Sequence, residues 1–141
     1  MLPYLQCMLV VAATAGLPPR VLPVIQVIEG GHIGTIRQDA NGTQDLGPMQ
    51  VNTVWLSSLA ARAGLSEAET RARLLNEPCF NIAAAALVLK TYLEQEHGAL
   101  LPAIGDYHSH RAAPHDAYVA KAEDTALRLF GNRPGVGRSG G

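Results

Sequence analysis

The chain has 141 residues, of which 48% are hydrophobic and 16% are charged, and its formal net charge is -1. This length suits one domain with its own hydrophobic core, and the composition excludes a disordered chain. No apolar run approaches the roughly 20 residues of a membrane-spanning helix, so we expect no membrane span. The chain also lacks the clustered Lys and Arg of nucleic-acid-binding proteins. We therefore expect a monomer that binds no nucleic acid.

The first fifteen residues allow two interpretations. The apolar run Cys7–Ala15 ends in small residues, as the core of a signal peptide does, but Met1–Gln6 has no positive charge, which signal peptides normally carry. The same run is typical of an apolar helix that ends at Gly16, with two prolines beyond it. We favour the helix.

The rest of the chain has a mainly helical pattern. Apolar residues at helical spacing over 21–28 place Glu29 in the last turn of a helix that two glycines terminate. The pair Asn41–Gly42, flanked by short segments, predicts a small β-hairpin. Ser66 and Glu69 form a capping box at a later helix start. Further helices are predicted over 53–63, 66–75, 80–96, from 102 to at least 107, and over 118–130. The helix over 80–96 contains four consecutive alanines and is expected at the centre of the core.

The fold class predicted from these patterns is mostly α with a small β-hairpin. Residues 1–130 form the expected domain, and 131–141 form an expected disordered tail. Cys7 and Cys79 have no partner at metal-ligand spacing, so the residues alone leave open a pair of thiols or a disulfide. No acidic residue or cysteine joins His108, His110 and His115 at a standard ligand spacing, so we expect solvated histidines, no metal and no cofactor.

Glu29 is the best candidate for a catalytic group. A carboxyl group at the end of an apolar helix suits the general acid of a glycosidase, because apolar surroundings raise its pKa. Short motifs follow it in a fixed order, namely Gly47-Pro48-Met49-Gln50-Val51-Asn52, Pro78-Cys79-Phe80-Asn81-Ile82 and Tyr107. With Glu29, this set resembles the soluble lytic transglycosylase family over about Cys7–Tyr118.

Within that family, Tyr107-His108-Ser109 resembles the small transglycosylases that accompany conjugation and type IV secretion systems. The resemblance implies a lysozyme-like α+β fold and a disulfide between Cys7 and Cys79. It also implies periplasmic location, with an export signal outside this chain. The expected partners are peptidoglycan glycan strands and components of a secretion or conjugation apparatus.

The resemblance further implies cleavage of the β-1,4 bond between N-acetylmuramic acid and N-acetylglucosamine, with Glu29 as the single acid and base. The substrate's own N-acetyl group assists instead of a second carboxylate. Glu29 then deprotonates the sugar's 6-hydroxyl, which closes the ring, so the product is a 1,6-anhydromuramic acid end. The residues expected to line or order the cleft are Met49, Gln50, Asn81, Tyr107 and His108. Gly30, Pro48 and His108 depart from the usual family residues.

Two other functions fit the sequence. A hydrolytic muramidase would need a second carboxylate, for which Asp39, Asp45 and Asp106 are candidates, Asp45 being the best placed. A non-catalytic peptidoglycan-binding or scaffold module is the other alternative, motivated by Gly30 and the family departure after Tyr107. Trp55 could serve as a sugar platform, but an apolar helical face favours a core position.

Overall fold

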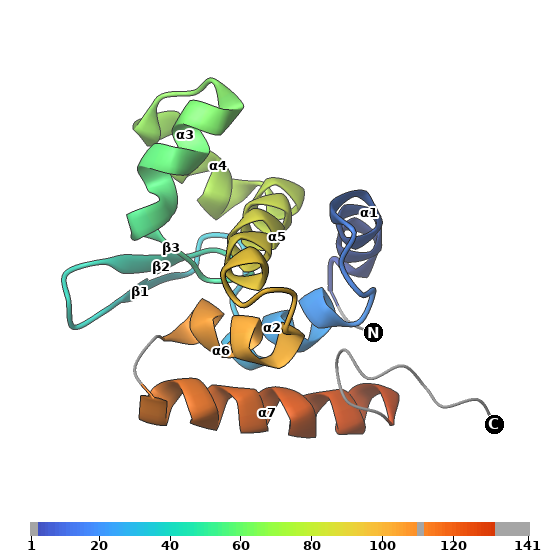
Figure 1. Ribbon diagram of the computed structural model, residues 1–141. Coiled ribbons are helices and arrows are strands. Elements are labelled where there is room, and N and C mark those ends of the chain that lie inside the picture. Colours follow the sequence, from blue (N-terminus) through green and yellow to red (C-terminus); the bar gives the residue numbers. More distant parts are fainter. Residues whose placement is uncertain (1–2, 110–111, 132–141) are drawn as a thin grey trace.

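The computed structural model describes residues 3–109 and 112–131 and is mostly helical, with a small antiparallel sheet (Figure 1). The helices are α1 (Leu5–Ala15), α2 (Val21–Glu29), η1 (Thr53–Trp55), α3 (Leu56–Ala63), α4 (Glu67–Asn76), α5 (Pro78–Gln95), α6 (Leu100–His108) and α7 (Ala112–Phe130). The strands are β1 (Ile36–Gln38), β2 (Gln44–Leu46) and β3 (Val51–Asn52). The predicted class, mostly α with a small β element, is confirmed.

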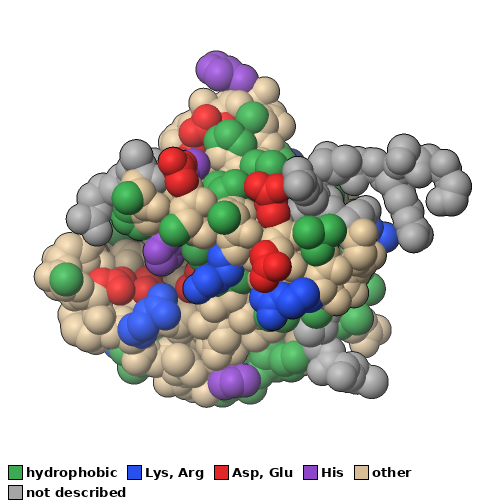
Figure 2. Space-filling model, turned by 90° about the horizontal axis from the view of Figure 1, so that it is seen from below, with side chains coloured by type: hydrophobic (Ala, Val, Ile, Leu, Met, Phe, Trp, Pro, Cys, Tyr) green, Lys and Arg blue, Asp and Glu red, His purple; other side chains and the backbone are tan. Residues whose placement is uncertain are grey.

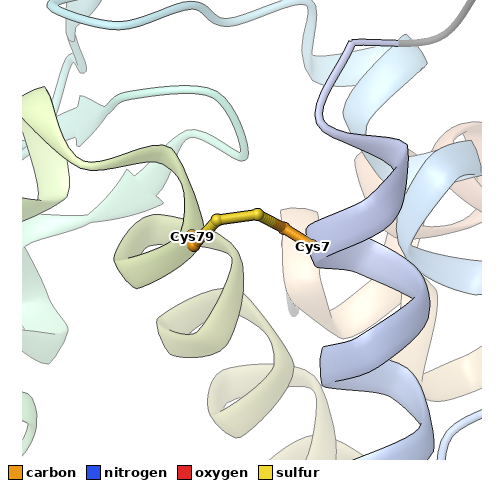
Figure 3. Close-up of a disulfide and its surroundings, with 2 residues drawn as sticks. All are labelled: Cys7 and Cys79. Atoms are coloured by element: carbon orange, nitrogen blue, oxygen red, sulfur yellow. A yellow bond between two sulfur atoms is a disulfide. The ribbon is translucent and has the colours of Figure 1, made fainter.

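The N-terminal segment forms the predicted helix α1 and packs against α5. It ends at Gly16, whose backbone is left-handed with φ 71°, a conformation that glycine adopts without steric cost. A disulfide between Cys7 and Cys79 joins α1 to the first turn of α5 (Figure 3). The two Cα atoms lie 5.5 Å apart although 72 positions separate them in sequence. The expected disulfide is confirmed.

Helix α5 is central, packing against α1, α4 and α6. Pro78 occupies its first turn, where a missing N–H costs nothing. Ala84, Ala85 and Ala86 are buried, and their small side chains let neighbouring helices approach closely. The core around them is made by buried aliphatic side chains from most elements, including Met8, Leu22, Ile25, Leu46, Met49, Leu74, Ile82, Leu89 and Ile104.

The sheet has one strand more than the predicted hairpin. Strands β1 and β2 pair around the Asn41–Gly42 turn in a register that sets Arg37 opposite Asp45. Strand β3 then pairs with β2, with Asn52 opposite Asp45. The third strand was not predicted because it has only two residues, too few for an alternating pattern.

Helix α7 runs along α2 and α6 and covers the end of α2 (Figure 1). It begins six residues earlier than the sequence pattern predicted, because Pro114 falls in its first turn and is tolerated there. Gly105 on α6 permits close packing, since a Cβ there would lie 2.4 Å from Nε2 of His115. Of the tail over 131–141, all but the first residue lies outside the described residues.

No single helix within the described ranges is long and apolar enough to cross a membrane. The pair α4 and α5 meets the length and composition criterion only together, and the two helices are bent by 111° at their junction.

Candidate active site

The end of α2 is held against the loop that follows β2. Gly30 ends the helix with φ 65°, and its N–H donates to the Gln26 carbonyl at 2.8 Å. Gly31 lies so close to the loop that a Cβ there would come within 2.1 Å of the Gly47 carbonyl oxygen. A side chain at this position would push the two segments apart. The two glycines therefore place Glu29 beside the segment that contains Gln50.

The Glu29 carboxylate is largely buried and receives two hydrogen bonds. Its side chain is 6% exposed. The Tyr118 hydroxyl donates to Oε2 at 2.7 Å, and Nη2 of Arg37 donates to Oε1 at 3.3 Å. Burial raises the pKa of Glu29, while the Tyr118 hydrogen bond and the Arg37 charge oppose this and the Asp45 charge adds to it. The net shift is upward, as a general acid requires.

Arg37 connects Glu29 to a polar cluster on the sheet. The same Nη2 atom also donates to Oδ2 of Asp45 at 3.1 Å. Asn52 on β3 donates to Asp45 and Asp39, each at 3.0 Å. Burial and the neighbouring Asp45 raise the pKa of Asp39. Arg37 itself is half exposed, so its guanidinium can move without unpacking the core.

These groups line a cavity of about 690 Å³. Four acidic residues contribute to its wall, namely Glu29, Asp39, Asp45 and Asp106. Of the candidate residues, Gln50, Tyr107, His108 and Trp55 line the cavity, whereas Met49 and Asn81 do not. Trp55 is half-buried, and its ring meets that of Tyr92 edge to face with centroids 5.7 Å apart. Its position is therefore in the cavity wall as well as against the core.

Gln50 and Tyr107 shape one wall of this cavity. Gln50 adopts φ 53°, which a side-chain-bearing residue rarely does, and its Nε2 donates to the Gly47 carbonyl at 3.0 Å. The Tyr107 hydroxyl donates to the Met49 carbonyl at 2.8 Å. Burial, followed by the charge of Glu29, raises the pKa of Tyr107 well above its ordinary value. Tyr107 thus lies near Glu29, but its hydroxyl holds backbone and does not contact the carboxylate.

Met49 and Asn81 both lie outside the cavity lining. Met49 was expected to line the cleft, whereas Asn81 was expected either to form hydrogen bonds within the cleft or to order backbone near Glu29. The Met49 side chain is fully buried in the core. Asn81 is also fully buried; its Oδ1 accepts from the Met49 N–H at 2.8 Å. Its Nδ2 donates to the carbonyls of Leu46 and Leu74 at 2.8 and 2.9 Å. All its hydrogen-bonding capacity serves the backbone because a buried polar group must be satisfied within the protein.

The sequence analysis did not identify Tyr118 and Arg37, whose side chains donate hydrogen bonds to Glu29. Tyr118 lies 89 positions from Glu29, on the helix that packs against α2. Its ring is stacked on that of His108, with centroids 4.8 Å apart and planes 4° apart. Burial, with the Arg37 charge next, lowers the pKa of His108, which favours a neutral imidazole.

The histidines are dispersed. His115 on α7 lies 2.9 Å from the Pro102 carbonyl and 3.2 Å from Oδ1 of Asp106, a buried carboxylate. His110 lies outside the described residues. Within the described ranges, no three His, Cys, Asp or Glu side chains are arranged to hold a metal ion.

The site therefore combines a buried carboxyl group with a raised pKa, two donors to that group, and a polar cavity beside it. In comparisons with known proteins, no family model and no curated sequence matches the chain.

Proposed function

We propose that the protein is a lytic transglycosylase of lysozyme-like fold, which cleaves the β-1,4 bond from N-acetylmuramic acid to N-acetylglucosamine. The observation that supports this most is the burial of Glu29 at the edge of a cavity of about 690 Å³, with its pKa raised. The motif resemblance around Gln50, Asn81 and Tyr107 adds to it. A cavity of this size accommodates sugar units, and its polar wall suits their hydroxyl and acetamido groups.

Glu29 acts twice. In its acid form it protonates the glycosidic oxygen as the bond breaks, while the N-acetyl oxygen of the same sugar attacks the anomeric carbon. In its carboxylate form it then takes the proton of the 6-hydroxyl, whose oxygen closes the 1,6-anhydro ring as the N-acetyl group leaves. The proton given in the first step is recovered in the second, so no water is consumed.

Arg37 and Tyr118 each donate a hydrogen bond to a different carboxylate oxygen of Glu29. While Arg37 donates to Oε1 and Tyr118 donates to Oε2, the carboxyl group is favoured in its ionised form. To carry a proton on Oε1, Glu29 must lose the Arg37 contact. Oδ2 of Asp45 accepts a hydrogen bond from Nη2 of Arg37 at 3.1 Å. Arg37 can therefore stay bound to Asp45 when it moves away from Glu29. Tyr118 remains in place as a positioning residue because its ring is packed against α2 and stacked on His108.

The direct test is Glu29→Gln. The amide is nearly isosteric but cannot donate or recover the proton, so release of soluble muropeptides from purified sacculi should fall below a few per cent of the native rate. Binding to sacculi and the melting temperature should be retained. Glu94→Gln, at an exposed position on α5, is the matched control and should keep full activity.

A hydrolytic muramidase is the second candidate, because Asp45 accepts a hydrogen bond from the same Nη2 atom as Glu29. Arg37 and Asn52 already occupy both oxygens of Asp45, which makes it a poor nucleophile. Anhydro ends support transglycosylation, and reducing ends support hydrolysis through Asp45. Binding to sacculi with no release of fragments at any pH would instead support a non-catalytic module.

We infer a periplasmic location and a role in opening the cell wall for a secretion or conjugation apparatus. The disulfide between Cys7 and Cys79 supports an oxidising compartment, because such bonds rarely persist in the cytosol. The substrate, peptidoglycan, lies in the same compartment. Retention of the disulfide in protein isolated from the native compartment, shown by resistance to alkylation, is the matching test.

A further inference from the structure

A second cavity adjoins Glu29. It has a volume of about 210 Å³ and shares Glu29, Arg37, His108 and Pro114 with the larger one. Its apolar wall comes from Ile28, Pro114 and Ala117, on α2 and α7, and Lys121 completes its rim. Figure 2 shows the face of the molecule on which α7 lies, where basic, acidic and histidine side chains are close together. Glu29 thus lies where two cavities of different size meet.

The two cavities differ in charge. The larger is lined by four carboxylates, and Arg37 is its single Lys or Arg among the described residues. The smaller is lined by Arg37 and Lys121, and Glu29 is its single carboxylate among the described residues. An anionic group near Glu29 is therefore repelled on one side and attracted on the other.

Both cations act on His108. The charge of Arg37 and the charge of Lys121 both lower the pKa of His108, after burial, and Asp45 opposes them. Arg37, His108 and Lys121 all line the small cavity. The lowered pKa favours the neutral imidazole, whose ring N–H is a hydrogen-bond donor.

Both cations can accept a ligand. Lys121 is exposed and forms no hydrogen bond or ion pair with another described residue. Arg37 is half exposed and uses only Nη2 for Glu29 and Asp45, so its other N–H groups are available. An arginine with a lysine beside it matches the geometry of a carboxylate, which has two acceptor oxygens.

We propose that the small cavity is a subsite for a carboxylate borne by a substituent of the sugar next to the scissile bond. This rests on the proposed function, because the muramic acid of peptidoglycan carries a lactyl group whose carboxyl is either free or extended by an acidic peptide. The carboxylate binds Arg37 and Lys121 while the substituent's methyl or methylene groups contact Pro114 and Ala117. Binding draws Arg37 away from Glu29, so recognition of the anionic substituent favours the acid form that the first step needs.

The test compares three glycans of matched length. One carries stem peptides, one has been stripped by an amidase so that the lactyl carboxylate is free, and one is a neutral chitin oligosaccharide. Lys121→Gln should lower kcat/KM on the carboxylate-bearing glycans about threefold to fivefold relative to the neutral one, as expected for one exposed charge contact. Lys121→Glu should further lower the ratio of kcat/KM on the carboxylate-bearing glycans to kcat/KM on the neutral glycan. Arg62→Gln removes a cation from α3, remote from the cavity, and should leave the ratio unchanged.

A binding measurement separates this inference from the proposed function. N-Acetylmuramic acid, but not N-acetylglucosamine, should shift the imidazole NMR signals of His108, and the shift should weaken in Lys121→Gln. If anhydro ends form but neither the ratio nor the NMR signals depend on Lys121, the subsite is refuted and the function stands. If no glycan is cleaved while N-acetylmuramic acid still shifts His108, the subsite stands and the function is refuted. A loss confined to one anionic glycan identifies whether the lactyl or the peptide carboxylate binds.

Discussion

Tyr118→Phe removes one hydroxyl and leaves the ring that stacks on His108. The lost contact is the 2.7 Å hydrogen bond to Oε2 of Glu29. Hydrogen bonds to charged groups contribute about 1.5 kcal/mol or more when buried. Without this one, the pKa of Glu29 should rise by about one further unit. The developing carboxylate also loses the same stabilisation as the glycosidic bond breaks, so kcat should fall about tenfold.

The assay is the pH dependence of muropeptide release. Because Glu29 must be protonated in the free protein, kcat/KM declines as pH rises through its pKa, and in Tyr118→Phe this decline should move up by about one pH unit. Tyr107→Phe is the matched control, since that hydroxyl bonds to the Met49 carbonyl. Tyr107→Phe should lower the free energy of unfolding by about 1 kcal/mol and should not change the pH at which kcat/KM declines. An unchanged profile and unchanged kcat in Tyr118→Phe would refute the role assigned to this hydroxyl.

Three further predictions concern stability. Reduction of the Cys7–Cys79 disulfide, which closes a long loop, should lower the free energy of unfolding by about 4 kcal/mol, whereas reductant should not affect the Cys7→Ser/Cys79→Ser variant. Asn81→Ala leaves three buried backbone groups unpaired and should cost about 3 kcal/mol or more in denaturant unfolding; a cost below 1 kcal/mol would contradict its supporting role. Because the folded-state pKa of Glu29 is raised above 4.5, the folded protein binds the extra proton, so stability should fall as pH rises from about 4.5 through the raised pKa. That fall should be smaller in Glu29→Gln.

Local patterns were enough to predict most of the fold. Gly16 and the two glycines after Glu29 ended helices where predicted, and the Ser66 hydroxyl accepts from the Glu69 N–H as a helix cap. These features depend on residues within four positions of each other. The start of α7 was misplaced because the apolar pattern used for the prediction begins only at Tyr118, whereas the helix begins at Ala112 with Pro114 in its first turn.

The candidate site was predicted only in part, because its contacts join distant segments. Glu29 could be identified from its helix end, but nothing local distinguishes Tyr118 from other aromatic residues on an apolar helical face. The position of Arg37 opposite Asp45 could have been predicted from the sequence. Arg37 and Asp45 each lie four residues from Asn41, so a hairpin centred on Asn41 sets these opposite charges against each other. For Asn81 the motif left two roles open, hydrogen bonding within the cleft or ordering backbone near Glu29, and only the fold brings together the three backbone groups that it holds.

In the proposed mechanism, the single carboxyl group of Glu29 cleaves glycan strands without consuming water. This mechanism is tested most directly by digesting purified sacculi with the full chain in isotopically labelled water and analysing the released ends by mass spectrometry. We expect 1,6-anhydromuramic acid ends that are one water lighter than reducing ends and contain no label, and we expect that Glu29→Gln forms none. Labelled reducing ends would contradict the mechanism.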